Sequence, residues 1–163
     1  MKALTDTQYI RQLVSEGEPC HQDFKFEISD ARKIARSLSA FANTEGGRLL
    51  IGVKDNGKIA GVRSDEEIYM IEAAATMYCK PKVELETQTY KVEGKTVLEI
   101  RINETVSKPV YALDETNKPW AYIRIKDENI LATPVHLKMW QHSKKPEGAL
   151  VTFTEREQRL LDV

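Results

Sequence analysis

The sequence predicts a two-layer α+β fold, in which a mixed β-sheet packs against two main helices, with a mixed α/β arrangement as the alternative. Three observations support this fold class. Two stretches, residues 30–45 and 65–79, have helix-start signals followed by apolar positions suited to helices. Short strand-like runs lie between and after them, and Asn56-Gly57 is a strong signal for a tight hairpin.

The first part of the chain predicts a short helix and a strand. Residues 6–16 carry apolar side chains at helical spacing, and Gly17 provides a helix end. Residues 23–28 alternate between apolar and charged side chains. This alternation predicts a half-buried strand with Phe26 on the apolar face and Asp23 on the polar face.

The central helix and strand follow directly. Asp30 is expected to cap a helix that carries an apolar stripe on one side and basic residues on the other. Gly46 or Gly47 supplies the left-handed residue that ends it. Residues 49–53 are continuously apolar, which indicates a central strand covered on both faces.

The later elements are predicted from similar local signals. Residues 64–67 have the spacing of a capping box that opens a helix reaching about Cys79, and Pro81 prevents its continuation. Further strands are expected at residues 83–92, 95–102, 109–113 and 119–125, and a last short helix at residues 135–142.

Composition divides the chain into four segments. These are an N-terminal helix (residues 1–16), a core domain (17–142), a linker (143–153) and the first helix of a further helical domain (154–163). The last segment begins with a helix-capping sequence after a Pro- and Gly-containing stretch. A frayed terminal helix is the alternative interpretation.

The bulk composition excludes several classes of protein. The net charge is −1 in 163 residues, which argues against a strongly basic nucleic-acid coat. No apolar run is long enough to cross a membrane, and the chain does not begin with a signal peptide. Cys20 and Cys79 are too few for a disulfide framework. We therefore expect a cytoplasmic protein with no membrane partner.

The charge is nevertheless unevenly distributed. Residues 24–58 hold seven Lys/Arg and four Asp/Glu, a balance of +3, whereas residues 63–79 have a balance of −3. A basic surface around the central helix indicates backbone phosphate contacts, and solubilising charges are the alternative. The candidate phosphate contacts are Lys25, Arg32, Lys33, Arg36, Lys54, Lys58, Arg124 and Lys126.

Six short motifs run through the core of the chain. They are Asp23-Phe24-Lys25, Ser39-Ala40-Phe41-Ala42-Asn43-Thr44-Glu45-Gly46-Gly47, Gly52-Val53-Lys54-Asp55-Asn56-Gly57, Ile59-Ala60-Gly61-Val62, Pro109-Val110-Tyr111 and Ala121-Tyr122-Ile123-Arg124. Together they closely resemble the Schlafen Alba-like domain, over about residues 16–135.

The resemblance implies an Alba-like two-layer fold with a nucleic-acid surface, DNA more than RNA, in a bacterial transcriptional regulator. Bacterial members often carry a winged-helix or helix-turn-helix domain after this module, which would account for residues 154–163. Some members are labelled ATP-binding, but the sequence has no Walker-type phosphate loop. Sheet edges beside an apolar N-terminal helix also allow a homodimer.

The resemblance also implies an alternative activity. Some eukaryotic relatives are metal-dependent ribonucleases, and their acidic residues correspond by position to Glu18, Asp23 and Asp55. Three converging carboxylates can hold Mg²⁺ or Mn²⁺. Asp23 stands where the family more often has Glu, which puts catalysis in doubt. In the alternative interpretation, Asp23 pairs with a lysine and Asp55 is a hairpin residue.

A structural role is favoured for the longest motif. Asn43 and Thr44 can bond loose carbonyls at a helix end, and Glu45 leads into the turn that Gly46 and Gly47 allow. A phosphate-binding loop is the alternative, but the dipole at a helix C-terminus disfavours anions.

These observations together predict a nucleic-acid-binding module of a bacterial transcriptional regulator that contacts mainly backbone phosphates. Neither catalysis nor a cofactor is expected. A nuclease dependent on Mg²⁺ or Mn²⁺ and a dimerisation or interaction module are the two alternatives.

Overall fold

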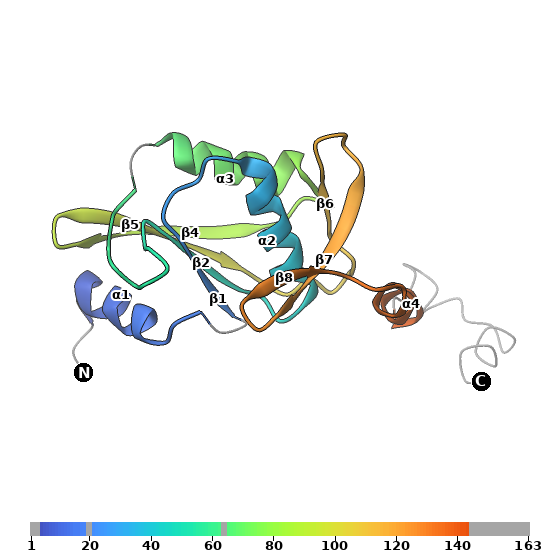
Figure 1. Ribbon diagram of the computed structural model, residues 1–163, viewed down its shortest axis with the longest axis horizontal. Coiled ribbons are helices and arrows are strands. Elements are labelled where there is room, and N and C mark those ends of the chain that lie inside the picture. Colours follow the sequence, from blue (N-terminus) through green and yellow to red (C-terminus); the bar gives the residue numbers. More distant parts are fainter. Residues whose placement is uncertain (1–3, 19–20, 63–64, 144–163) are drawn as a thin grey trace, which may run out of the picture. The chain divides into compact units, whose positions relative to one another are not determined.

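The computed structural model describes residues 4–18, 21–62 and 65–143. The chain divides into two units, residues 1–132 and 133–163, which are described separately. The first unit contains the helices α1 (Asp6–Ser15), α2 (Ala31–Asn43) and α3 (Glu66–Met77) and all of the strands (Figure 1). The second unit contains α4 (Pro134–Ser143).

The first sheet has four strands and mixed pairing. Its order is β1 (Gln22–Lys25), β2 (Gly47–Ile51), β5 (Lys95–Ile102) and β4 (Leu85–Val92). β1 runs parallel to β2, and the other neighbours are antiparallel. The β4–β5 hairpin turns at Glu93 and Gly94. Both residues have positive φ, as the type I′ turn of a two-residue hairpin requires.

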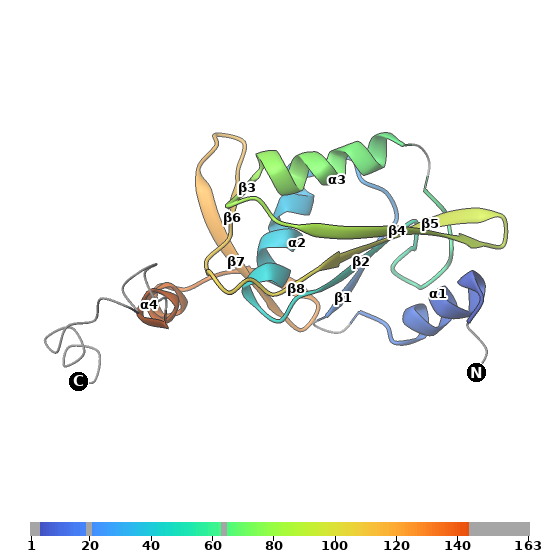
Figure 2. The same cartoon turned by 180° about the vertical axis from the view of Figure 1, so that it is seen from behind.

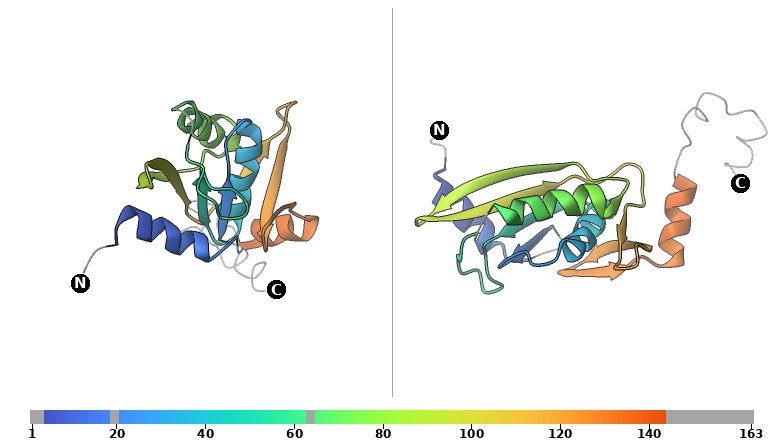
Figure 3. Two further views of the ribbon diagram at one scale, coloured as in Figure 1. Left: turned by 60° about the vertical axis from the view of Figure 1, so that its left-hand side comes forward. Right: turned by 90° about the horizontal axis from the view of Figure 1, so that it is seen from above.

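Helices cover both faces of the first sheet (Figures 1 and 3). On one face, α2 and α3 pack their apolar residues, including Leu38 and Phe41, against Leu49 and Ile100. On the other face, α1 inserts Ile10. The central strands are therefore buried on both sides, which explains the continuous apolar run in β2.

The second sheet is antiparallel, with the order β3 (Cys79–Lys80), β6 (Tyr111–Leu113), β7 (Pro119–Ile125) and β8 (Glu128–Leu131). It packs against α2 through β6 and β7 (Figure 2). As a result, α2 contacts both sheets, and only a narrow stripe of the helix remains accessible.

The α+β class with a mixed sheet is confirmed, and so are most elements. Asp30 caps α2, its carboxylate accepting the backbone N–H of Arg32 at 2.9 Å. The Asn56-Gly57 turn forms, but it closes a single bridge, between Val53 and Ile59, rather than a longer hairpin.

Three local predictions need correction. β1 ends at Lys25, so the strand predicted at residues 23–28 is shorter, and Asp23 is buried because α2 and β7 cover its side of the sheet. β3 and β8 were not predicted, because strands of 2 and 4 residues are too short to show a period. The carboxylate of Asp65, at the N-cap of α3, accepts no capping hydrogen bond, and Ser64 of the predicted capping box lies outside the described residues.

α4 occupies the position of the predicted last helix, residues 135–142. Beyond Ser143, the predicted linker (143–153) and terminal helix (154–163) lie outside the described residues. Within the described ranges, no helix combines the length and the apolar character needed to cross a bilayer.

Candidate nucleic-acid interface

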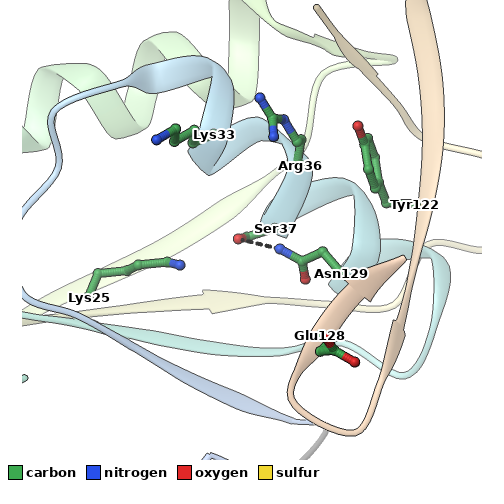
Figure 4. Close-up of a pocket in the computed structure, with 7 residues that line it drawn as sticks. All are labelled: Lys25, Lys33, Arg36, Ser37, Tyr122, Glu128 and Asn129. Carbon is green, nitrogen blue, oxygen red and sulfur yellow. Dashed lines mark hydrogen bonds between the residues drawn. The ribbon is translucent and has the colours of Figure 1, made fainter. Parts of the chain in front are cut away.

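Three of the predicted phosphate contacts meet in one hollow of the surface. Lys33 and Arg36 come from the accessible stripe of α2, and Lys25 comes from the end of β1. The hollow has a volume of about 350 Å³ and is open to solvent. It is completed by Ser37, Tyr122, Glu128 and Asn129 (Figure 4). We call these seven residues the basic hollow.

The walls of the basic hollow are fixed by hydrogen bonds. The amide of Asn129 on β8 donates to the Ser37 hydroxyl at 3.0 Å, and this bond ties the β7–β8 hairpin to α2 (Figure 4). The same Asn129 accepts a hydrogen bond from Arg124 at 2.8 Å. The site is therefore carried by regular elements rather than by a loose loop.

Arg124 is not a surface residue, and its predicted contact with phosphate is wrong. Its side chain is 1% exposed, because β7 turns it inward against the ring of Phe41. The guanidinium lies 3.7 Å from Asp23 and donates to the Gln22 carbonyl at 3.3 Å. Arg124 thus balances a buried carboxylate beneath the basic hollow.

The candidate cations of β1 and α2 differ in how far their side chains are paired within the protein. Lys25 is paired with Asp23 at 3.0 Å but keeps a third of its side chain exposed. Arg36 lies 3.9 Å from the exposed Glu115, a contact that solvent weakens. Arg32 is committed elsewhere, because it donates to the Asp114 carbonyl and stacks 4.3 Å from the Tyr78 ring centre. Lys33 is exposed.

The remaining predicted cations lie in two turns. The ammonium of Lys54 is 5.4 Å from the centre of the Phe26 ring, and these two residues line a second hollow with Asp55 and Asn56. Lys58 is exposed at the other end of the same turn. Lys126 is exposed in the β7–β8 turn, where its φ is 56°.

The acidic residues of the nuclease alternative lie near one another. The Glu18 carboxylate accepts the backbone N–H of Phe24 at 3.3 Å. Burial, a hydrogen bond with Asp23 and the negative charges of Asp23 and Asp55 raise the pKa of Glu18 to about 7. Glu18 therefore holds a proton over part of the neutral pH range.

This arrangement does not fit a metal ion as it stands. Both carboxylate oxygens of Asp23 face cations, one toward Lys25 and the other toward Arg124. Among the residues that the structure describes, no three His, Cys, Asp or Glu side chains are placed so that they could hold a metal ion. The negative charge of Asp23 is already balanced by the protein.

The longest motif holds α2 to the second sheet. The Asn43 side chain donates to the carbonyls of Val110 and Tyr122, both at 2.9 Å, and accepts the Val110 N–H at 2.7 Å. The Thr44 hydroxyl accepts the backbone N–H of Arg124 at 2.8 Å. The polar groups of these two side chains are thus bonded to backbone groups of the second sheet and of the segment before it.

The two glycines of the motif are required by close packing. Gly46 has a φ of 74°, and a Cβ there would lie 2.6 Å from the Ile102 carbonyl oxygen. A Cβ on Gly47 would lie 2.5 Å from the Phe41 ring. Glu45 is exposed and lies 3.2 Å from the His21 ring nitrogen.

Sequence reasoning missed part of the site. Ser37, Tyr122 and Asn129 were not candidates, because the docking of the second sheet on α2 brings them together. Phe26 was assigned to a buried face, yet its side chain is 40% exposed. The sequence holds no signal for this exposure, because the alternation of residues 23–28 continues past Lys25, where β1 ends.

Comparison with known proteins supports the fold. The structure resembles the DIP2311 protein from Corynebacterium diphtheriae with a TM-score of 0.55 and 21% identity, over 74% of this chain but only 23% of that one. It also resembles the N-terminal domain of a RecG-related protein from Nitrosomonas europaea, with a TM-score of 0.53 and 22% identity, over 75% of this chain and 88% of that one.

A search of curated proteins found no match. The sequence itself matches the family model described as Schlafen, AlbA_2 over residues 18–133, a range that contains both sheets, α2 and α3. The chain therefore belongs to the Schlafen, AlbA_2 family.

Proposed function

We propose that this chain binds nucleic acid, chiefly through backbone phosphates, as a module of a bacterial transcriptional regulator in the cytoplasm. The observation that carries the proposal is the basic hollow, where Lys25, Lys33 and Arg36 from two elements face one open space. Family membership and the likeness to a domain of a RecG-related protein agree with a role on nucleic acid. We expect DNA to be bound more tightly than RNA.

The chemistry of the hollow suits a phosphate chain better than a single small anion. Its cations are spread over β1 and α2, and the hollow is open to solvent. Tyr122 and Asn129, which are partly exposed, add a hydroxyl and an amide N–H that can bond phosphate or sugar oxygens. Glu128 at the rim would repel phosphate, so the path of the backbone should follow the α2 side.

Salt dependence tests the proposal. Neutralising phosphates releases counterions, so three contacts should give a slope of log affinity against log salt of roughly −2 to −3. Affinities for labelled DNA and RNA would be measured by fluorescence anisotropy at several salt concentrations. An affinity that does not change with salt would remove the phosphate contacts from the proposal.

A substitution of Lys33 tests whether binding depends on the basic hollow or only on the net charge of the protein. Lys33→Gln should weaken binding and make the salt slope shallower by about 0.7 to 0.9, because one phosphate contact is lost. Lys82→Gln is the matched control, since Lys82 is exposed but lies outside both hollows. Equal effects of the two substitutions would mean that only net charge matters. If the unaltered protein bound neither DNA nor RNA and light scattering showed a dimer, the interaction module would be favoured.

A nuclease dependent on a divalent cation is the second candidate, favoured by the proximity of Glu18, Asp23 and Asp55. RNA and single-stranded DNA would be incubated with the protein and Mn²⁺. Our proposal expects no cleavage, because Lys25 and Arg124 already occupy Asp23. Cleavage that disappears in Asp55→Asn but persists in Asn56→Ala would establish the nuclease instead.

A further inference from the structure

The strand β4 forms one edge of the first sheet and is open along much of its length. Among the described strands it pairs only with β5, and this pairing runs without a bulge from Leu85 to Val92. All of residues 86–89 are exposed. A regular strand edge of this kind is a template on which a further strand can add.

Two hydrogen bonds show which backbone groups of β4 point outward, away from β5. The Lys91 N–H donates to the Asp6 carboxylate of α1 at 3.1 Å. Thr96, which lies opposite Lys91 on β5, turns its carbonyl away from β4, where it accepts the Val62 N–H at 2.7 Å. The direction of the backbone groups alternates along a strand. The other outward-pointing residues of β4 are therefore Leu85, Thr87 and Thr89.

The features that usually protect a strand edge lie at the two sides of this open stretch. The Glu86 carboxylate is 3.6 Å from Arg101 on β5, so its charge is balanced within the sheet. Lys91 lies at the end that Asp6 covers. Between them, residues 87–89 are Thr-Gln-Thr, which carry no charge, and two of the three are β-branched. The middle of β4 is therefore suited to pairing with a strand.

We infer that β4 pairs with β4 of a second copy of this chain, antiparallel about a two-fold axis at Gln88, so that the two first sheets become one continuous sheet. The inference is independent of the proposed function. In this register, Thr87 of each copy lies opposite Thr89 of the other, and these residues exchange the backbone hydrogen bonds that each copy leaves unused. The partner is thus a strand of the same sequence.

The sequence of β4 is complementary to itself in this register. Each Thr87 faces a Thr89, and such threonine pairs across strands are favourable. Gln88 faces the Gln88 of the second copy, and each Glu86 faces a Tyr90. No two like charges lie directly opposite each other. An isologous contact of this type closes on itself and gives a dimer rather than a fibre.

The neighbouring registers are less favourable for stated reasons. An axis at Thr87 would place the two Glu86 carboxylates at diagonal positions, where residues are roughly 7–8 Å apart and like charges repel. An axis at Thr89 would need the Lys91 N–H for pairing, and the Asp6 carboxylate already accepts it. Charge on one side and the α1 contact on the other therefore select Gln88 as the centre.

Sedimentation equilibrium at several protein concentrations tests the pairing. The unaltered chain should pass from monomer to dimer as its concentration rises. Thr87→Pro should raise the dissociation constant of the dimer about tenfold or more, because each copy loses an outward N–H. The bonds to β5 are kept, since the Thr87 N–H points away from that strand.

A second substitution uses charge instead of a lost hydrogen bond. Thr89→Lys should also weaken the dimer, because it puts a lysine on the open edge of each copy. Thr76→Lys is the matched control, since Thr76 is exposed on α3 and lies outside β4, and it should leave the dissociation constant unchanged. Circular dichroism and thermal unfolding would show that each variant is folded.

Cysteine crosslinking tests the register. In Gln88→Cys the two new residues face each other with Cα atoms about 4.5 Å apart, so mild oxidation should link the copies. Glu86→Cys should remain unlinked, because the two positions are roughly 14 Å apart along the strands. Both variants would carry Cys20→Ser, which leaves the buried Cys79 as the only other thiol.

Three results would overturn the inference. A chain that stays monomeric at every concentration forms no such pair. A dimer whose dissociation constant is the same in folded Thr87→Pro and Thr89→Lys as in the unaltered chain uses another surface. Crosslinking through Glu86→Cys but not through Gln88→Cys would place the two-fold axis elsewhere. None of these results bears on the basic hollow, whose test is the salt dependence of nucleic-acid binding.

Discussion

At the scale of single residues, position in the fold decides what each polar side chain does. Asn43 and Arg124 both belong to motifs that resemble a nucleic-acid-binding family, and both are buried. Asn43 satisfies backbone groups of Val110 and Tyr122. Arg124 neutralises Asp23. They hold in place the surfaces that carry Lys25 and Asn129.

Replacing Asn43 tests this structural role. Asn43→Ala leaves the Val110 N–H and the Tyr122 carbonyl without their partner, whereas the Val110 carbonyl keeps the Ser39 hydroxyl. Each unpaired group costs about 1–3 kcal/mol, so we expect a loss of about 3 kcal/mol in the free energy of unfolding. Urea unfolding would measure it. Asn103→Ala is the control, because Asn103 is exposed, and it should change stability by less than about 0.5 kcal/mol. Equal stability of the two variants would contradict the role.

At the scale of elements, the sequence predicted correctly those helix starts and turns that depend only on neighbouring residues. α2 begins at its Asp30 cap, and the β4–β5 hairpin turns at Glu93-Gly94, because capping and positive φ depend on neighbouring residues. Alternation, by contrast, assigns faces only while a strand continues. β1 stops at Lys25, so the alternation no longer held at Phe26.

Burial of the charged residues could not be predicted from the sequence. Asp23 is buried because α2 crosses its side of the first sheet and the second sheet packs against α2 in turn. The residues of the basic hollow come from positions 25 to 129, and no local spacing relates them. The charge distribution identified the segment of α2 as basic, but only the packing of the two sheets selects Lys33 and Arg36 over Arg32.

α1 is docked to the first sheet by a polar contact as well as an apolar one. Glu99 on β5 is fully buried and accepts hydrogen bonds from Tyr9 at 2.7 Å and Tyr90 at 3.2 Å. Burial and the Glu99 charge raise the pKa values of both tyrosines, which keeps their hydroxyls protonated as donors. Arg48, at 3.8 Å, adds a compensating charge. This cluster lies on the sheet face opposite α2 and therefore stabilises the scaffold rather than the basic hollow.

At the scale of the whole molecule, a net charge of −1 is compatible with phosphate binding because the charges are segregated. The basic hollow lies on the first unit of the fold, and Asp23 of the acidic trio pairs with Lys25 of that hollow. The charge of that trio therefore sets the local potential that a phosphate meets. Its protonation should be visible in both stability and binding.

Stability should decrease as the pH rises from about 5 to 8. The pKa of Glu18 is raised to about 7 in the folded protein, above its ordinary value of 4.5, so the folded state binds the proton more tightly than the unfolded chain. The stabilisation from this proton is complete below the unfolded pKa and is lost as the pH passes the folded pKa. Urea unfolding at several pH values would measure the decrease.

Nucleic-acid affinity should fall over the upper part of the same range, because ionised Glu18 adds a negative charge beside Asp23 and Lys25. Glu18→Gln removes this titration, so the variant should show a flatter dependence of both stability and affinity on pH. Glu16→Gln is the control, since Glu16 is an exposed carboxylate at the end of α1. If Glu18→Gln kept the full pH dependence, the proton on Glu18 would have no part in either property, and the acidic trio would be electrostatically separate from the basic hollow.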